Sequence, residues 1–275
     1  MQQGGADVSF DECFSHRTNM VEAKEEKWRP PLFLSPGSRW SGIVAQLRRF
    51  FDLQAGSIWN DLARLLPHAT GVVLDVGCGA QPYRKLFSAA ARYRGIDAAT
   101  AKSHFGYEVP DTVYYEGNIW PVADGSVDFI LCTETLEHIL EPQQFLREAR
   151  RCLRPGGSIV LTIPFAARWH FIPYDYWRMT PSALDHVLRD CGFVQPRVYA
   201  RGNAGTVACY KMMAIILPLL MPLGSRPIVR WTCRVLATPL IPIVILLAAA
   251  GNWTLQGRGG DDCLGYTVLS KRELD

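Results

Sequence analysis

An acidic side chain stands just before a glycine-rich turn in the segment "VVLDVGCGAQPY" (72–83). Asp75 lies in an apolar run that predicts a buried strand, and Gly77 and Gly79 follow it. A carboxylate is costly to bury there unless another group hydrogen-bonds to it. Glycines let the backbone turn sharply and approach a ligand closely. The pattern therefore indicates a ligand-binding site at the end of this strand.

Polar residues also follow the next three predicted strands. They are Asp97 after "RYRGI", Asn118 after "TVYYEG", and Thr133 with Glu134 after "SVDFILC". An acid such as Asp97 can accept hydrogen bonds from a ribose diol, and the Asn118 amide can meet the edge of a purine. Ligands of parallel sheets bind outside the carboxyl ends of the strands. The sequence thus predicts a nucleoside-containing ligand in one crevice.

The turn favours S-adenosylmethionine over a dinucleotide in that crevice. A dinucleotide site usually has a third glycine where this chain has Pro82. An acid before the turn would repel a pyrophosphate, whereas Asp75 suits a ligand with an ammonium group. S-adenosylmethionine has a zwitterionic amino acid and a sulfonium cation but no phosphate. An NAD-dependent oxidoreductase is therefore the disfavoured alternative.

Apolar periodicity predicts alternating strands and helices through most of the chain. Strands are expected at 71–76, 92–97, 112–118, 126–133, 158–164, 192–201 and 263–272, and helices at 40–66, 81–91 and 142–153. Alternation of this kind indicates an α/β fold with a doubly wound, mostly parallel sheet. Residues 1–36 lack such periodicity and are predicted to form an irregular arm.

Composition excludes several classes of protein. The eight cysteines contain no C-x-x-C pair, so we expect reduced thiols and predict neither a disulfide framework nor a metal site. Cys132 and Cys152 fall within a predicted strand and helix and are expected in the core. A net charge of +3 is too small to argue for a nucleic-acid partner. The N-terminus, polar and mixed in charge, does not resemble a secretory signal.

Residues 72–164 resemble the class I S-adenosylmethionine-dependent methyltransferases of type 11. The resemblance is carried by "VVLDVGCGAQPY", "YRGIDA" and "GNIWPVADGSVDFILCTETLEHILEPQQFLREARRCLRPGGSIVLTIPF". It implies a Rossmann-like sheet of seven strands, with the seventh antiparallel between the fifth and sixth. It also implies roles around the cofactor. Asp75, Gly77 and Gly79 would line its amino-acid end, Asp97 would bind the ribose hydroxyls, Asn118 and Ile119 the adenine, and Thr133 would lie beside it.

Methyl transfer from a sulfonium needs positioning of the acceptor, and a base where the acceptor is a hydroxyl. Candidate catalytic residues are His138, His170 and Tyr174, with Glu137 and Asp175 facing the same crevice. Two alternatives stay open. Glu137 and His138 could cap or orient the helix that follows them, and the aromatic loop around His170 could be a packed lid.

A hydrophobic insertion separates the last two predicted strands. Between Cys191 and Gly260 there is no Asp or Glu, against seven Arg and Lys. Arg226, Arg230 and Arg234 recur at four-residue spacing beside Trp231. This pattern is typical of a segment lying on an anionic membrane surface.

The insertion is poorly suited to crossing a bilayer. Met212–Ser225 has 14 uncharged residues, or about 21 Å of helix, against a hydrocarbon core of about 30 Å. Val235–Gly257 has 23 residues but is interrupted by Pro239 and Pro242. Both flanking strands belong to one sheet, so the number of crossings must be even. We favour a monotopic or re-entrant insertion over two crossings; a lid or dimer interface in a soluble protein is the alternative.

The predicted protein has three parts: an N-terminal arm and helix (1–66), a methyltransferase domain (67–204 and 261–275) and a membrane-associating insertion (205–260). We expect a methyltransferase at the cytoplasmic face of a membrane, bound through residues 212–257. Its acceptor would be a lipid-linked or membrane-associated small molecule, such as a glycolipid or prenyl-linked compound. A non-catalytic S-adenosylmethionine-binding or scaffold protein is the alternative class.

Overall fold

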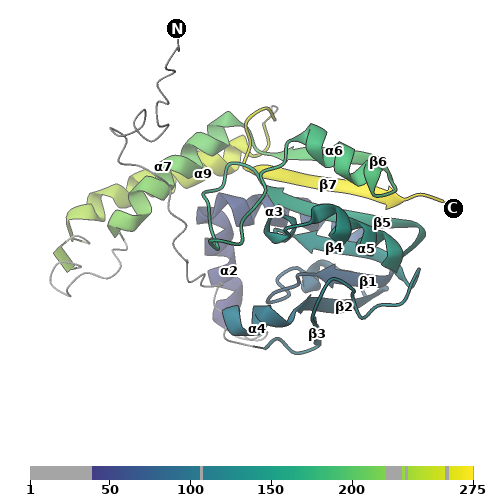
Figure 1. The fold of residues 1–275 in the computed structure, drawn as a ribbon. Helices are drawn as coiled ribbons and strands as arrows, with labels where there is room; N and C mark the ends of the chain where they lie inside the picture. The colour runs from purple at the N-terminus through teal and green to yellow at the C-terminus, as the bar shows by residue number, and fades with distance from the viewer. Residues whose placement is uncertain (1–38, 106–107, 221–230, 233–234, 258–259, 275) are drawn as a thin grey trace, which may run out of the picture.

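A central sheet with helices on both faces and a helical hairpin projecting from one end make up this protein (Figure 1). The structure, a computed structural model, describes residues 39–105, 108–220, 231–232, 235–257 and 260–274. The predicted arm (1–36) and the basic stripe of Arg226, Arg230 and Arg234 lie outside the described residues.

The sheet has seven strands in the order β3-β2-β1-β4-β5-β7-β6. In chain order they are β1 (Gly71–Val76), β2 (Ala91–Ala98), β3 (Thr112–Tyr115), β4 (Val127–Thr133), β5 (Leu153–Pro164), β6 (Phe193–Arg201) and β7 (Gly265–Arg272). β7 pairs antiparallel with both β5 and β6, while β1 to β5 pair in parallel. The predicted topology is confirmed. The chain reverses its strand order at β1, where ligand sites of such sheets lie.

Alternate side chains of the central strands pack under different helices, because successive strand residues point to opposite faces. On one face Leu131 and Val160 pack with α3 (Leu53–Leu65), through Ile58 and Leu62. On the other, Ile130 and Leu161 pack with α5 (Pro142–Cys152) and α6 (Pro181–Asp190). Cys132 and Cys152 are buried in this second core, as expected. Burial on both faces explains why the strands read as continuous apolar runs.

The single helix expected over 40–66 is two helices, α2 (Arg39–Phe51) and α3. Asp52 interrupts them because its backbone is extended and its carboxylate accepts a hydrogen bond from the Ala55 amide, 3.1 Å away. This is an N-cap interaction, which starts a new helix. A 3₁₀ turn, η1 (Leu66–His68), ends α3 before β1.

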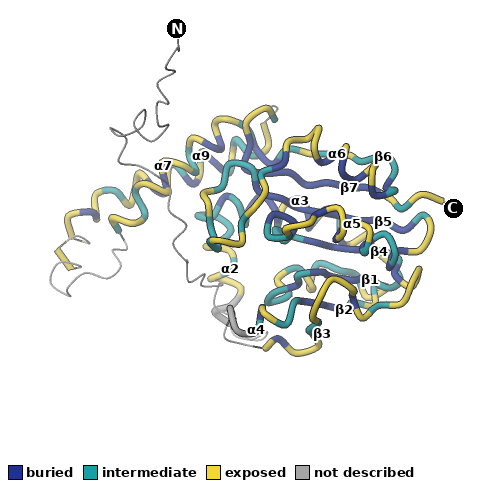
Figure 2. The backbone as a smooth tube through the Cα atoms, viewed as in Figure 1, coloured by how far each residue is buried: buried dark blue, intermediate teal, exposed yellow. Residues whose placement is uncertain are grey.

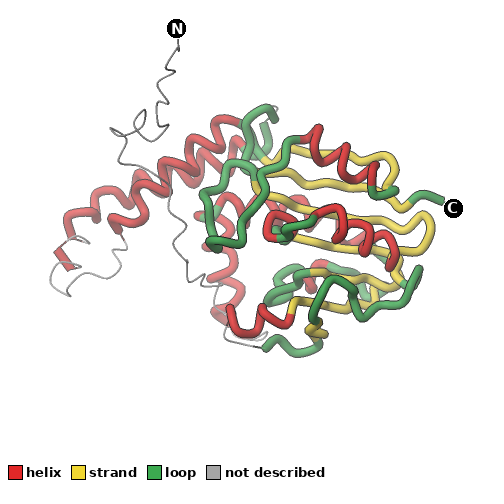
Figure 3. The backbone as a smooth tube through the Cα atoms, viewed as in Figure 1, coloured by secondary structure: helices red, strands yellow, loops and turns green. Residues whose placement is uncertain are grey.

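The helix predicted at 81–91 does not form, and the prediction was wrong. Only a 3₁₀ turn, η2 (Arg84–Leu86), lies there, and β2 already begins at Ala91. Gln81 has a left-handed backbone (φ 53°), which a helix start cannot contain. Consequently no α-helix begins directly after the glycine turn. A short helix, α4 (Ala99–Phe105), follows β2 instead, and β3 ends at Tyr115, before Asn118 (Figure 3).

The insertion between β6 and β7 forms a helical hairpin of α7 (Ala204–Leu220) and α9 (Ile241–Thr254), with η4 (Thr238–Leu240) before α9. Its base is tied to the sheet domain. The Asn252 amide donates to the Phe50 carbonyl (2.9 Å), and the Thr206 and Thr254 hydroxyls lie 2.9 Å apart. Among the described residues, one helical stretch, Val235–Thr254, is long and apolar enough to span a membrane by length and composition.

Candidate active site

The glycine turn after β1 is held by Asp97 from the neighbouring strand. The Asp97 Oδ2 accepts from the Gly79 amide (2.9 Å) and its Oδ1 from the Ala98 amide (2.8 Å). The Gly77 amide donates to the Ile96 carbonyl (2.9 Å). Burial raises the pKa of Asp97, although both amide bonds act in the opposite direction. Asp97 therefore fixes the loop on which a ligand would rest.

Asp75 is almost fully buried at the end of β1. Its Oδ2 accepts from the Tyr93 hydroxyl (2.6 Å), whereas its Oδ1 is buried without a hydrogen bond to any described residue. Burial raises the pKa of Asp75 to about 7; the Tyr93 hydroxyl lowers it and the charge of Asp97 raises it further. A buried acceptor without a donor is unfavourable, so the Asp75 Oδ1 is free to accept a hydrogen bond from a ligand.

The two glycines of the turn have different surroundings. Both have left-handed backbones, φ 68° at Gly77 and 48° at Gly79. A Cβ on Gly77 would collide with the Thr135 side chain, whereas a Cβ on Gly79 would meet nothing. Gly77 is thus required by packing, and Gly79 borders open space beside the carboxylates.

The other residues predicted at the cofactor lie along the same edge of the sheet. Asn118 and Ile119 follow β3 in an exposed loop; Asn118 donates to the Gln144 side chain (3.0 Å), and Ile119 is 75% exposed. Thr133 ends β4, and its carbonyl accepts from the Thr135 hydroxyl (3.0 Å). An apolar side chain as exposed as Ile119 is available to cover a flat ring.

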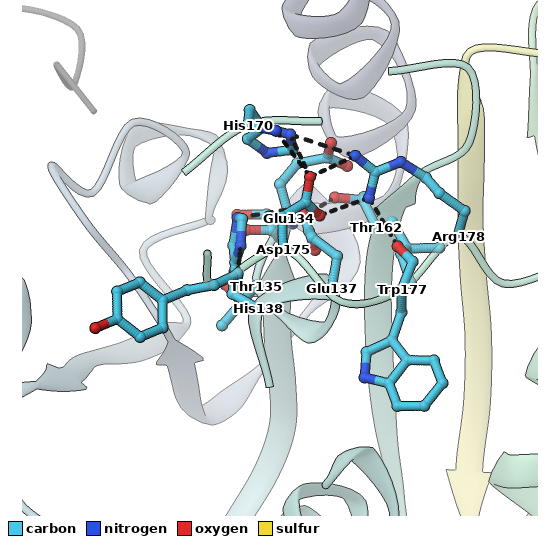
Figure 4. A network of polar contacts seen from close by, with 12 residues as sticks. Glu134, Thr135, Glu137, His138, Thr162, His170, Asp175, Trp177 and Arg178 are labelled. Atoms are coloured by element: carbon cyan, nitrogen blue, oxygen red, sulfur yellow. Dashed lines mark hydrogen bonds and ion pairs between the residues drawn. The ribbon is translucent and has the colours of Figure 1, made fainter. Parts of the chain in front are cut away.

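A second polar cluster follows β4 and β5 (Figure 4). Glu137 lies in η3 (Leu136–His138), is fully buried, and neither carboxylate oxygen has a hydrogen bond to a described residue. Burial raises its pKa well above the usual value, and the charge of Glu134 raises it further. Glu137 and His138 lie before α5 without capping it, because the N-cap is Glu141, whose side chain makes no capping bond.

His138 and His170 meet in this cluster, with ring centroids 5.0 Å apart in an edge-to-face arrangement. The His138 Nδ1 lies 2.7 Å from the Tyr174 carbonyl, and its Nε2 lies 3.7 Å from the Glu137 Oε1. A carbonyl only accepts, so the His138 Nδ1 carries the hydrogen. Burial lowers the pKa of His138, although the Tyr174 carbonyl acts in the opposite direction.

Asp175 positions the His170 loop. It accepts from the His170 amide (3.0 Å) and forms a two-pronged ion pair with Arg178 (2.6 and 2.7 Å). Burial would raise the pKa of Asp175, but these bonds outweigh it and the pKa is lowered. The His170 Nδ1 lies 3.0 Å from both the Asp175 Oδ2 and the Arg168 carbonyl.

Two contributions to the site were not predicted from the sequence: the backbone carbonyl of Tyr174 and the side chain of Arg201. Tyr174 reaches the cluster through its carbonyl, while its ring packs tilted against Phe171 (centroids 5.4 Å apart) and is 45% exposed. Arg201, at the end of β6, is buried and its Nη2 lies 2.8 Å from the Glu134 Oε1. The signal for Arg201 was a charged residue at the end of a predicted strand.

The family described as "Methyltransferase domain" matches residues 74–161. An uncharacterized methyltransferase of Mycobacteroides abscessus is 33% identical over 129 residues, which cover 42% of this chain and 50% of that protein. The human thiol S-methyltransferase TMT1A is 30% identical over 132 residues, covering 43% and 52%. The chain thus spans about half the length of these curated relatives.

Solved structures with related folds include a SAM-dependent methyltransferase from Archaeoglobus fulgidus, with 15% identity, a TM-score of 0.49 and coverage of 86% of this chain and 100% of that chain. Another is phosphoethanolamine N-methyltransferase 2 of Haemonchus contortus in complex with S-adenosyl-L-methionine. It shows 14% identity, a TM-score of 0.44 and coverage of 78% and 53%.

The sheet order and the glycine turn define an α/β domain with its ligand site at the carboxyl edge. Residues 74–161 form a methyltransferase domain of the class I, S-adenosylmethionine-dependent family. The residues present fit that cofactor. Asp75 offers an unpartnered buried carboxylate oxygen to an ammonium group, and Gly79 leaves open space beside it.

Proposed function

We propose that this chain is a methyltransferase that acts on a lipid-linked or membrane-associated small molecule, with its hairpin seated in the membrane surface. One observation carries the proposal: the α7–α9 hairpin, much of which is exposed (Figure 2), carries exposed apolar side chains and begins beside the Arg201–Glu134 ion pair at the edge of the sheet where the candidate site lies. The hairpin would then hold the active site near acceptors whose reactive groups lie at the membrane surface.

The base of the hairpin is adjacent to the active site. β6 ends at Arg201 and α7 begins at Ala204, and β6 runs in the same direction as β4 because both are linked through antiparallel β7 and parallel β5. The Arg201–Glu134 ion pair joins the end of β6 to the residue after β4. An acceptor anchored beside the hairpin therefore has a short path to the candidate site residues.

The hairpin exposes an unusual amount of apolar surface. Its large exposed side chains are Met212, Ile215, Leu219, Trp231, Val235, Leu236, Ile241, Ile243, Ile245, Leu246 and Trp253. Lys211 is the sole charged residue among the described residues 204–220, 231–232 and 235–257. Contiguous apolar surface of this kind marks a protein or membrane interaction site, and seven cationic residues without an acid in 191–260 favour an anionic membrane.

Length and packing favour insertion into one leaflet. α7 has 17 residues, which span about 25 Å at about 1.5 Å per residue, short of a hydrocarbon core of about 30 Å. Part of α9 is unavailable to lipid because Val244, Ala248 and Gly251 are buried in the hairpin and against the sheet domain. A Cβ on Gly251 would collide with Leu53.

Each group of candidate site residues has a role in this proposal. Bound S-adenosylmethionine would supply an activated methyl group, so the protein has to bind it and orient the acceptor. Asp75, Asp97, Gly77 and Gly79 hold the cofactor, with Asn118, Ile119 and Thr133 around its adenosine. His138, His170 and Tyr174 line the acceptor side.

Vesicle flotation with Leu246→Asp tests the membrane half of the proposal. Leu246 is 68% exposed on α9, so the substitution should not disturb packing. An aspartate at the centre of an inserted helix costs about 2.5–3.5 kcal/mol. We therefore expect binding to vesicles containing anionic phospholipid to fall by about two orders of magnitude, since about 1.4 kcal/mol corresponds to a factor of ten. Leu274→Asp is the matched control, because Leu274 is 77% exposed near the C-terminus, away from the hairpin (Figure 1).

Methyl transfer is measured on the same proteins with radiolabelled S-adenosylmethionine and a membrane lipid extract. Label in the organic phase, lost in Leu246→Asp but not in Leu274→Asp, supports the proposal. Equal vesicle binding by wild type and Leu246→Asp would refute membrane seating. Dimerisation of the wild type that Leu246→Asp abolishes would instead identify the hairpin as a dimer interface. S-adenosylhomocysteine binding without transfer to any fraction would favour a non-catalytic protein.

A further inference from the structure

We propose that Glu137, His138 and His170 bind a divalent transition-metal ion that holds the oxygen of the methyl acceptor. One donor atom from each of these residues can be chosen so that all three lie within 4.8 Å of one another. The role of the ion in holding the acceptor rests on the proposed methyltransferase function, whereas the metal site itself does not.

The three donor atoms would have to draw together to hold a single ion. Ligand atoms about 2.0–2.2 Å from a metal can lie at most about 4.4 Å apart, and closer in tetrahedral or octahedral arrangements. The Glu137 Oε1 and the His138 Nε2 are already 3.7 Å apart. In a tetrahedral site the ligand atoms lie about 3.4 Å apart, so donor atoms that are up to 4.8 Å apart would have to approach by up to about 1.4 Å through side-chain rotation.

The hydrogen bonds of both histidines leave the same nitrogen available. The His138 Nδ1 is held by the Tyr174 carbonyl (2.7 Å), and the His170 Nδ1 lies 3.0 Å from the Asp175 carboxylate. The Tyr174 carbonyl places the hydrogen of His138 on its Nδ1. At His170 two oxygens lie 3.0 Å from the Nδ1, closer than the Arg178 Nη2 at 3.4 Å, which favours the tautomer that leaves the Nε2 lone pair available. Metal-binding histidines are held in this way, by an oxygen acceptor on the other nitrogen.

Glu137 differs from its acidic neighbours because no arginine forms an ion pair with it among the described residues. Asp175 is paired with Arg178, and Glu134 is paired with Arg201. Glu137 is fully buried, and its two oxygens have no hydrogen bond from a described residue. A buried carboxylate without donors is strongly unfavourable, and its position beside two imidazoles points to a ligand ion.

The cluster is open on one side, as a catalytic metal site requires. The Glu137 side chain is fully buried, whereas each imidazole is 21% exposed. Three protein ligands and an open position are typical of catalytic sites. Imidazole donors favour Zn²⁺, Fe²⁺ or Co²⁺ over the hard ions Mg²⁺ and Ca²⁺. As a base, one histidine would suffice; three donors converging on one point are what a metal needs.

The ion would act as a Lewis acid on an acceptor hydroxyl, lowering the pKa of that hydroxyl. The hydroxyl proton leaves to solvent water, and the oxygen forms a bond to the methyl carbon of S-adenosylmethionine. The carbon–sulfur bond breaks with its electron pair remaining on sulfur, so the sulfonium becomes the neutral thioether of S-adenosylhomocysteine. No oxidant or reductant is needed.

Metal titration of the full chain tests the site directly. Protein stripped with a chelator is titrated with Co²⁺, followed by its visible absorption, and with Zn²⁺ by calorimetry. We expect one ion per chain. His170→Ala and Glu137→Gln should each weaken binding by at least about 100-fold, the upper part of the range for losses around a metal site. His186→Ala is the matched control, because His186 is exposed on α6 outside the cluster.

S-adenosylhomocysteine affinity, measured on each sample, shows whether the variant is folded; His170→Gln replaces His170→Ala if that protein is not. Normal cofactor affinity with no metal binding in the wild type overturns the metal site and leaves the proposed function intact. Equal metal affinity in wild type and both ligand variants also overturns it. Stoichiometric metal binding without methyl transfer to any acceptor keeps the site and rejects the proposed function.

Discussion

Apolar side chains are buried in the sheet domain but largely exposed in the α7–α9 hairpin. In the central strands, side chains such as Leu74, Ile130 and Leu161 are almost completely buried, and the polar residues gather at one edge. In the hairpin, Ile215, Leu236 and Leu246 are about 70% exposed, and polar residues are rare. The sheet domain thus buries its own apolar surface, whereas the described part of the hairpin leaves much of its apolar surface exposed.

The polar contacts of one side chain, that of Arg201, join the two regions. Arg201 ends β6 just before the hairpin, pairs with Glu134, and donates to the Ile163 carbonyl (3.1 Å) and the Ser57 hydroxyl (3.4 Å). The active-site edge and the base of the hairpin therefore share one buried guanidinium. A change at this point should affect both regions, whereas changes within either region should separate them.

Arg201→Ala is expected to have the largest effect. Removing one partner of a buried ion pair typically costs about 3–5 kcal/mol. For a chain of this size that lowers the melting temperature by roughly 10 °C. Thermal unfolding measures the effect, and Arg197→Ala on the exposed side of the same strand is the control. Equal melting temperatures for the two variants would show that Arg201 does not couple the regions.

The glycine turn gives the next largest effect, through a matched pair of variants. Gly79→Ala should cost about 1–2 kcal/mol of stability, the usual penalty of a left-handed backbone, because a Cβ meets nothing there. Its affinity for S-adenosylhomocysteine should fall about 100-fold, since the methyl group enters the space proposed for the cofactor.

Gly77→Ala adds a collision with Thr135 to the same backbone penalty, so we expect a larger loss of stability than in Gly79→Ala. Calorimetric binding and thermal unfolding of both proteins separate cofactor contact from packing. If Gly79→Ala binds S-adenosylhomocysteine as tightly as the wild type, the open space beside Asp97 does not belong to the cofactor.

The sequence predicted the sheet and the turn because their signals are local. Asp75 between apolar residues, with Gly77 and Gly79 after it, specifies a buried strand and a tight turn within a few positions. The antiparallel seventh strand followed from the family resemblance. The helix at 81–91 was predicted wrongly because apolar spacing cannot reveal the left-handed backbone of Gln81 or the early start of β2.

The polar clusters could be predicted only in part. His138 and His170 were each candidates, but their approach depends on the loop after β5 folding back over η3, fixed by Asp175 and Arg178. Sequence spacing holds no information on such a contact between distant segments. The burial of Glu137 without a hydrogen bond from a described residue likewise depends on the tertiary fold, which the pattern "TLEHIL" does not show.

The pH dependence of stability offers a smaller and more specific test. Burial raises the pKa of Asp75 to about 7 from an ordinary 3.8, so the folded protein retains a proton that the unfolded chain has lost. The stability from this difference is fully present below about pH 4 and is lost as pH rises through about 7. Asp75→Asn should therefore stabilise the protein at about pH 8 more than at about pH 5.

Cofactor affinity should rise with pH, whereas the stability contribution of Asp75 falls. A ligand ammonium prefers the ionised Asp75 carboxylate, so S-adenosylhomocysteine affinity should rise by up to about tenfold per pH unit below the pKa and level off above it. Tyr93 and Asp97 are the groups facing this carboxylate, and Asp75→Asn should flatten the profile. A wild-type profile as flat as that of Asp75→Asn would show that the ammonium does not meet Asp75.

The smallest expected effect concerns a single residue of the hairpin. Trp253 is 79% exposed near the base of α9, where a tryptophan would meet the headgroup region if the hairpin enters the membrane from its far end. Trp253→Ala should weaken vesicle binding only about three- to tenfold, because an interfacial ring gains part of the roughly 1.5–3 kcal/mol of full apolar burial. Trp253→Phe should recover part of the loss, and the melting temperature in detergent should not change for either variant. A loss as large as that of Leu246→Asp would place Trp253 deep in the lipid. The base of the hairpin would then lie in the bilayer, and the hairpin would enter the membrane more deeply than insertion into one leaflet allows.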